Sequence, residues 1–276
     1  LAASTTASMC DAAGMASAEQ ARAMAVAILR PDTLARILEG GTSAATLARL
    51  LGHLDEGHLG AVLARLPATQ DEALAGAMHD YLVRVGRGRE PLVGEILGTA
   101  EVDVGLALIR VLSRIGTEAA RQAILRGASS RHAVVRIEAL AHMEGASSER
   151  LRLELKAFLE DEEPAVRLAA LRTIGKHRVR AAGPSLVLRI KSPRFDALPE
   201  GERALALETL ATLAPSRAET VCVELLDEGG GLLATDAHEQ TRVLAVGLLA
   251  RIGRSQEPRE ALARASQSRW GASAKV

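Results

Sequence analysis

One helical pattern recurs in the second half of this sequence, and it restricts the fold more than any other feature. The pattern is an arginine, two residues, an alanine, an apolar residue, two further residues and another apolar residue. Its arginines are Arg136, Arg167, Arg203 and Arg242, at spacings of 31, 36 and 39 residues. A period of about 20 to 50 residues is typical of repeat arrays, in which each unit buries its faces against its neighbours. We therefore predict an all-α fold, an α-α superhelix of about six to seven helical hairpins.

Each copy of the pattern places an apolar arc on one side of a helix. In the stretch 160–178, Pro164 opens a helix on which Val166, Ala170 and Ile174 share one side. Arg167 falls in the middle of that side. The stretches between copies each have room for one more helix, at 117–126, 148–160, 182–191 and 216–227. The N-terminal third also predicts helices, with two short ones in 45–67 and others at 18–29, 70–86 and 91–99.

The strength of the pattern divides the chain into three parts. Residues 1–16 are small and polar, which favours a linker or flexible N-terminal segment. Residues 17–100 are expected to form degenerate helical repeats, and residues 101–276 regular repeats with a C-terminal capping helix. The copy before Arg136 is degenerate because Gly105 stands in place of its arginine. Since the sequence does not begin with Met, we expect it to be part of a larger bacterial protein.

Composition excludes several other classes of protein. Four residues of the 276 are aromatic, which argues against sandwiches and barrels. The 34 basic and 34 acidic residues balance, so no general attraction to nucleic acid or to membranes is expected. No apolar run approaches the roughly 18 residues of a membrane span. The two cysteines, Cys10 and Cys222, are far apart and predict reduced thiols in a cytoplasmic protein.

The sequence DEEPAVRLAALRTIG, followed by AAGPSLVLRI, resembles a HEAT repeat, in particular the phycobilin-lyase-type HEAT-like subgroup. The likeness covers about residues 130–253. In that family the repeat arginine commonly pairs with an aspartate of the preceding turn and forms a ladder between repeats. The resemblance therefore implies the pairs Asp161/Arg167 and Asp236/Arg242. Arg136 and Arg203 belong to the same ladder, but Ser130 and Ala197 stand where their aspartates would be.

The strongest functional signal is a run of cations without acids. Excluding the repeat arginine, seven basic residues are candidates for binding a partner: Arg172, Lys176, Arg178, Arg180, Arg189, Lys191 and Arg194. The planar guanidinium matches a carboxylate, so the expected partner is another protein with an acidic surface. The scarcity of aromatic residues for stacking on bases disfavours nucleic acid. The alternative is a solvated surface whose charge is compensated by neighbouring repeats.

Known catalytic and metal-binding motifs are missing. The sequence contains no GxGxxG, P-loop, CxxC or HExxH, and the acidic run 160–163 suits a helix N-terminus. We therefore predict no catalytic residues, no metal and no cofactor, and a non-catalytic protein–protein interaction scaffold. Two alternatives stay open: a HEAT-type lyase or maturation enzyme, and an anion- or nucleic-acid-binding module that uses the basic patch at 167–194. The oligomeric state is not predicted.

Overall fold

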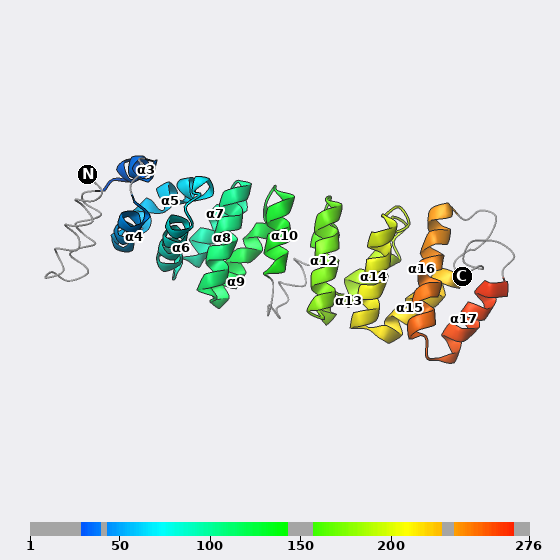
Figure 1. Ribbon diagram of the computed structural model, residues 1–276. Coiled ribbons are helices and arrows are strands. Elements are labelled where there is room, and N and C mark those ends of the chain that lie inside the picture. The colour runs from blue at the N-terminus through cyan, green and yellow to red at the C-terminus, as the bar shows by residue number, and fades with distance from the viewer. Residues whose placement is uncertain (1–28, 40–42, 143–156, 228–234, 268–276) are drawn as a thin grey trace. The chain divides into compact units, whose positions relative to one another are not determined.

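A computed structural model of the chain describes residues 29–39, 43–142, 157–227 and 235–267. All regular structure in these ranges is helical, which confirms the all-α class (Figure 1). Contacts between residues divide the chain into two compact units, Leu1–Met143 and Glu144–Val276. The predicted linker 1–16 and most of the helices predicted at 18–29 and 148–160 lie outside the described residues.

The first unit is a stack of helical hairpins. Its helices are α3 (Pro31–Glu39), α4 (Ala44–His53), α5 (Leu59–Arg65), α6 (Glu72–Gly86), α7 (Glu90–Thr99), α8 (Val102–Ile115), α9 (Glu118–Ile124) and α10 (Ala133–Ala141). The helices α4, α6, α8 and α10 pack on one another in chain order, while α3 packs on α5 and α7 on α9. Because α7 also packs on α8, contacts cross the boundary predicted between residues 100 and 101, and the division into units comes later in the chain.

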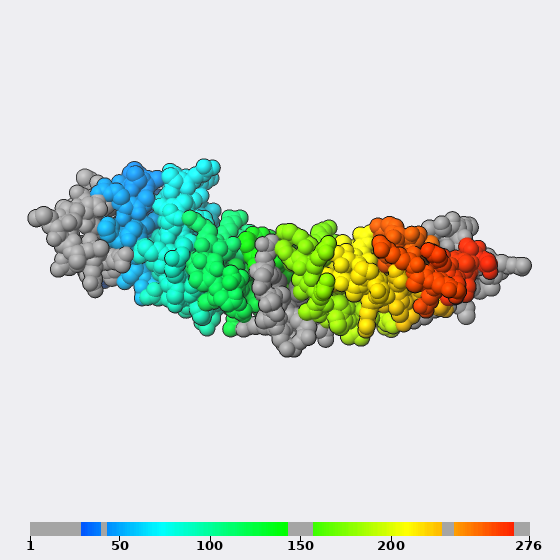
Figure 2. All heavy atoms as spheres, turned by 90° about the horizontal axis from the view of Figure 1, so that it is seen from below, coloured from blue at the N-terminus to red at the C-terminus, as the bar shows by residue number. Residues whose placement is uncertain are grey.

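The second unit repeats this arrangement. Its helices are α12 (Pro164–Lys176), α13 (Gly183–Ile190), α14 (Glu200–Leu213), α15 (Pro215–Asp227), α16 (Asp236–Ile252) and α17 (Gln256–Gln267). The helices α12, α14 and α16 pack in chain order, and Figure 2 shows the atoms of α12 to α17 following one another from green to red. The helix α17 packs on α15 and α16, where the capping helix was predicted. Stacked hairpins are thus present in each unit, and the superhelix stays a prediction.

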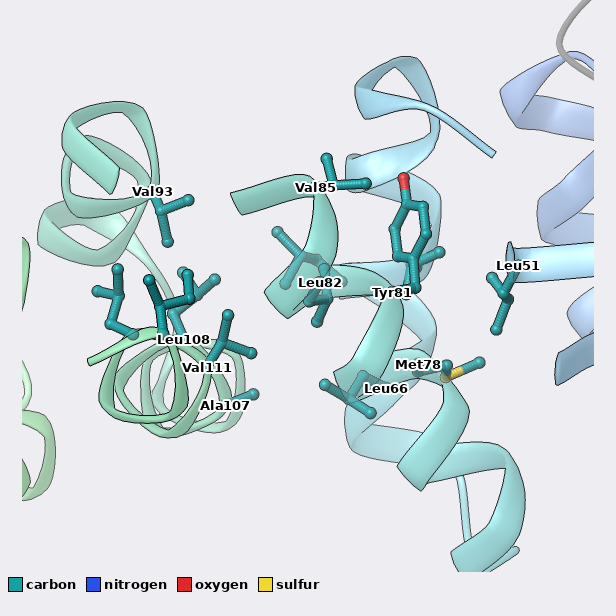
Figure 3. Packing of buried hydrophobic residues seen from close by; sticks show 14 of the residues in the cluster. Leu51, Leu66, Met78, Tyr81, Leu82, Val85, Val93, Ala107, Leu108 and Val111 are labelled. Atoms are coloured by element: carbon teal, nitrogen blue, oxygen red, sulfur yellow. The ribbon is translucent and has the colours of Figure 1, made fainter. Parts of the chain in front are cut away.

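Aliphatic side chains join neighbouring helices of the first unit. Met78 and Leu82 of α6 are 0 % and 1 % exposed. In Figure 3, Met78 lies on the side of α6 that faces Leu51 of α4, and Leu82 lies on the side that faces Val111 of α8. Burying one such side chain contributes roughly 1.5 to 3 kcal/mol, so α6 binds both of its neighbours through apolar contact.

The alanine of the repeat pattern occupies fully buried positions. Ala139, Ala170, Ala206 and Ala245 are each 0 % exposed. A small side chain there lets adjacent helices approach closely. In the degenerate copy, a Cβ atom on Gly105 would lie 3.0 Å from Cγ2 of Val135 on α10. Val135 of the neighbouring hairpin therefore occupies the space that an arginine side chain at position 105 would need. This explains why a glycine stands there.

Candidate functional site

The four repeat arginines lie in the interior. Arg136, Arg167, Arg203 and Arg242 are 7 %, 9 %, 2 % and 3 % exposed. This confirms that they belong to the packing of the repeats. A buried guanidinium needs hydrogen-bond acceptors, since an unpaired buried charge is costly. Their partners therefore decide how the hairpins are joined.

Arg167 pairs with an acid of the next repeat. Its Nε and Nη2 donate to Oε1 and Oε2 of Glu202 on α14, at 2.7 and 2.8 Å. Its Nη1 donates to the main-chain carbonyls of Asp161 and Glu162, at 2.8 and 2.9 Å. The predicted pairing with the Asp161 carboxylate is wrong, because the guanidinium reaches across to α14. Oδ1 of Asp161 instead accepts the N–H of Glu163 at 2.9 Å, in the turn that precedes α12.

The six-residue offset predicted for the ladder involves the main chain. Nη1 of Arg136 donates to the carbonyl of Ser130 at 2.8 Å, at the same offset that joins Arg167 to the carbonyl of Asp161. Because the acceptor is a main-chain oxygen, the side chain at that position need not be acidic. This accounts for Ser130 at a place where the family pattern has an aspartate.

The remaining two arginines use acceptors on α16 and at the end of α15. Arg203 donates to the carbonyl of Ala237, to Oγ1 of Thr241 and to Oε1 of Gln240, at 2.5, 2.6 and 2.9 Å. Arg242 donates to Oε1 of Glu239 at 2.6 Å and to the carbonyl of Leu226 at 3.2 Å. The predicted pair Asp236/Arg242 is therefore wrong, since Glu239 is one helical turn closer. Asp236 is exposed in the first turn of α16, where a negative charge is favourable.

Glu202 is the residue that sequence reasoning missed. It is 1 % exposed and lies between the guanidinium groups of Arg167 and Arg189. Burial alone would raise the pKa of this carboxyl, but the hydrogen bonds from Arg167 and Arg189 outweigh it and lower the pKa. The pKa of Arg167 is raised, chiefly by its hydrogen bond with Glu202. A weak signal existed, because an acid directly precedes the arginine of the next copy.

Arg189 and Lys191, which are among the seven candidate binding residues, pair with described acids. Nη2 of Arg189 donates to Oε1 of Glu202 at 2.7 Å, and the Arg189 side chain is 15 % exposed. Nζ of Lys191 lies 2.6 Å from Oε2 of Glu224 on α15. Arg189 therefore belongs to an internal cluster, and Lys191 joins neighbouring hairpins. These two pairings are the compensation by neighbouring repeats that the alternative prediction describes.

The other candidates are exposed and divide between the two ends of the α12–α13 hairpin. Arg189, at the end of α13, binds Glu202 beside Arg167. Arg178 follows Arg167 by 11 residues, roughly 16 Å along a helix, so Arg178 lies at the other end. Arg194 lies near the Arg189 end. Arg172 and Lys176 lie on α12, and Arg178 and Arg180 follow its end; we name these four residues the α12-end cluster. Arg172, Arg178, Arg180 and Arg194 form no ion pair with any described residue.

Arg178 has an unusual backbone conformation. Its φ is 49°, and it is the non-glycine residue with positive φ in the described ranges. There it closes α12, because its N–H and that of Val179 donate to the carbonyls of Gly175 and Ile174, at 3.2 and 3.0 Å. Glycine is the usual residue at such a position, as Gly116 is at the end of α8, with a φ of 68°. The left-handed conformation costs an ordinary residue about 1 to 2 kcal/mol.

A groove of about 580 Å³ lies at the Arg189 end of the hairpin. Its apolar lining includes Leu188, which is 71 % exposed, and Phe195, which is 2 % exposed. Arg189 and Arg194 line it as well, together with Glu160 and Asp161. The groove thus combines apolar surface with charges of both signs.

Two partly or fully buried histidines, His58 and His238, have partners within the chain. His58 is 2 % exposed, with Nδ1 3.0 Å from Oδ1 of Asp55 and Nε2 2.6 Å from the carbonyl oxygen of Leu29. Nδ1 of His238 is 2.9 Å from Oδ2 of Asp196. Within the described ranges, no three His, Cys, Asp or Glu side chains are grouped so that they could hold a metal ion. None of the helices described there is both long and apolar enough to cross a membrane.

Comparison with family models and with curated proteins gives no match. The resemblance to HEAT repeats therefore stays a prediction from the sequence.

Proposed function

We propose that this chain is a non-catalytic, cytoplasmic scaffold that binds an acidic protein surface through the α12-end cluster. The contrast between two sets of arginines supports the proposal. The interior arginines use carboxylates and carbonyls of their own chain, as Arg167 does with Glu202. Arg172, Arg178 and Arg180 are exposed and have no acidic partner among the described residues.

The observation that carries the proposal is the conformation of Arg178. A left-handed backbone holds an arginine where a glycine would cost less. Strained residues persist where the surrounding structure holds them in place, and they concentrate at functional sites. An exposed guanidinium in this position offers its donors to an external carboxylate.

A protein fits this cluster better than a nucleic acid. The cluster contains no aromatic side chain on which a base could stack. The whole chain has a formal net charge of zero, so the long-range attraction of a polyanion is weak. Surface carboxylates of a protein match guanidinium groups at short range, through paired hydrogen bonds.

Affinity purification with the intact chain tests the proposal. The wild-type chain is compared with the triple variant Arg172→Glu, Arg178→Glu and Arg180→Glu. We expect the wild-type chain to retain a stoichiometric protein partner and the triple variant to lose it. The matched control replaces Arg217, Arg254 and Arg259 by Glu, since these arginines are also exposed, belong to the same unit and form no described ion pair. Equal recovery by both variants would refute the assignment of the cluster.

A further inference from the structure

The groove at the Arg189 end is lined by charges of both signs, namely Arg167, Arg189 and Arg194 with Glu160 and Asp161. Arg167 and Arg189 share the single carboxylate of Glu202, through contacts of 2.7 to 2.8 Å. Arg167 uses two of its donors on this carboxylate and Arg189 uses one, so the guanidinium of Arg189 is less fully paired than that of Arg167.

Arg189 is only partly satisfied. It donates one hydrogen bond, from Nη2, and its Nε is buried without a hydrogen-bond partner in the described structure. Arg194 lines the same groove, is exposed and forms no ion pair with the described residues. Arg194 therefore has donors available to an acceptor that enters the groove, beside the partly satisfied guanidinium of Arg189.

The apolar part of the groove is also open. Leu188 exposes 71 % of its surface, the largest value among the large apolar residues of the described ranges. It lines the groove together with Leu198 and Phe195. A volume of about 580 Å³ suits a ligand of a few side chains.

We propose that this groove binds a short peptide segment that carries a carboxylate beside a large apolar side chain. The carboxylate would accept hydrogen bonds from Arg189 and Arg194, and the apolar side chain would cover Leu188 and Leu198. The negative charges of Glu160 and Asp161, which also line the groove, disfavour a ligand with several acids and favour a single carboxylate. This proposal concerns a surface distinct from the α12-end cluster, and it holds or fails independently of the function proposed above.

Selection from a phage-displayed library of random seven-residue peptides on the intact chain tests the proposal. We expect the enriched peptides to share an Asp or Glu within two positions of a Leu, Ile, Met or Phe. The double variant Leu188→Glu and Arg194→Glu should weaken their binding by at least about tenfold, the loss of about 1.4 kcal/mol. Both replaced side chains are exposed, so folding should be retained, which circular dichroism checks.

Two controls separate this groove from other surfaces. The double variant Leu92→Glu and Arg217→Glu makes the same chemical changes at exposed positions elsewhere, and it should bind the selected peptides like the wild-type chain. The triple variant of the α12-end cluster should also bind them unchanged. The proposal is overturned if no peptide is enriched, if the enriched peptides lack the acid, or if the Leu188/Arg194 variant binds them as well as the wild-type chain.

Discussion

Arg167 on α12 and Glu202 on α14 are joined by two hydrogen bonds of 2.7 and 2.8 Å, although 35 residues separate them in sequence. Their side chains are 11 % and 1 % exposed. The pair therefore links α12 to α14 of the next repeat in the interior of the second unit. Arg189 adds a third hydrogen bond to the same carboxylate, so three helices meet at Glu202.

Removing the charge of Glu202 should destabilise the second unit. The variant Glu202→Gln leaves two buried guanidinium groups without their carboxylate, and we expect a loss of about 3 kcal/mol at pH 7, measured by urea unfolding. Glu208→Gln is the control, because Glu208 lies on the same helix in an exposed ion pair with Arg251. The control should lose less than about 1 kcal/mol. Equal losses would show that the buried cluster adds nothing.

The stability provided by Glu202 should also depend on pH. The pKa of this carboxyl is lower in the folded chain than its ordinary value, near 4.3 in the unfolded chain. Its ionisation therefore contributes fully above about pH 4.3 and is lost as the pH falls through the folded value. The difference in unfolding free energy between wild type and Glu202→Gln should shrink in this acidic range. A difference independent of pH down to pH 2 would contradict the ion-pair interpretation.

Replacing Arg178 by glycine should increase the stability of the chain and weaken its binding of the partner. The variant Arg178→Gly removes the cost of a left-handed arginine, and we expect it to raise the unfolding free energy by about 0.5 to 1 kcal/mol. The same variant should retain less of the partner in affinity purification. The reverse change, Gly116→Arg at the end of α8, should lower stability, since its φ is 68°. A variant Arg178→Gly that is less stable than wild type would contradict the strain argument.

Gly94 should be intolerant of a methyl group. A Cβ atom on Gly94 of α7 would lie 3.0 Å from Cβ, 3.1 Å from Cα and 3.2 Å from the carbonyl oxygen of Ala123 on α9. Gly94→Ala should cost about 1 kcal/mol or more, even though alanine favours a helix. Gly76→Ala is the matched control, because nothing lies within 4 Å of its Cβ position, and it should stabilise α6 by about 0.5 to 1 kcal/mol. Thermal melting of both variants distinguishes the outcomes.

The thiol of Cys222 should react slowly with a thiol reagent while the chain is folded. Cys222 is 0 % exposed, and burial raises its pKa to about 12. Because the thiolate is the reactive form, labelling should require unfolding. The Cys10→Ser variant isolates this thiol, and its labelling should become rapid in urea. Rapid labelling in buffer would show that α15 opens readily.

The sequence predicted the helices and the buried arginines well, because both follow from local periodicity. The helix predicted at 70–86 is α6, and those predicted at 182–191 and 216–227 are α13 and α15. The partners of the arginines were predicted poorly. Whether Arg167 pairs with Asp161 or with Glu202 depends on the distance between its guanidinium group and the next helix of the stack. A local sequence pattern does not determine that distance. The seven basic residues are close in sequence but differ in their surroundings, since Arg189 pairs with the buried Glu202 whereas Arg178 is exposed after the end of α12.

The most direct test of the functional claim is the association rate constant with the recovered partner, measured as a function of ionic strength. Salt screens exposed charges beyond about 8 Å at 0.15 M. We expect the wild-type rate to fall by about tenfold or more between about 0.02 M and 0.5 M salt, and the triple variant of the α12-end cluster to lose most of this dependence. A wild-type rate that does not change with salt, or an equally steep dependence in the triple variant, would contradict recognition of an acidic surface by Arg172, Arg178 and Arg180.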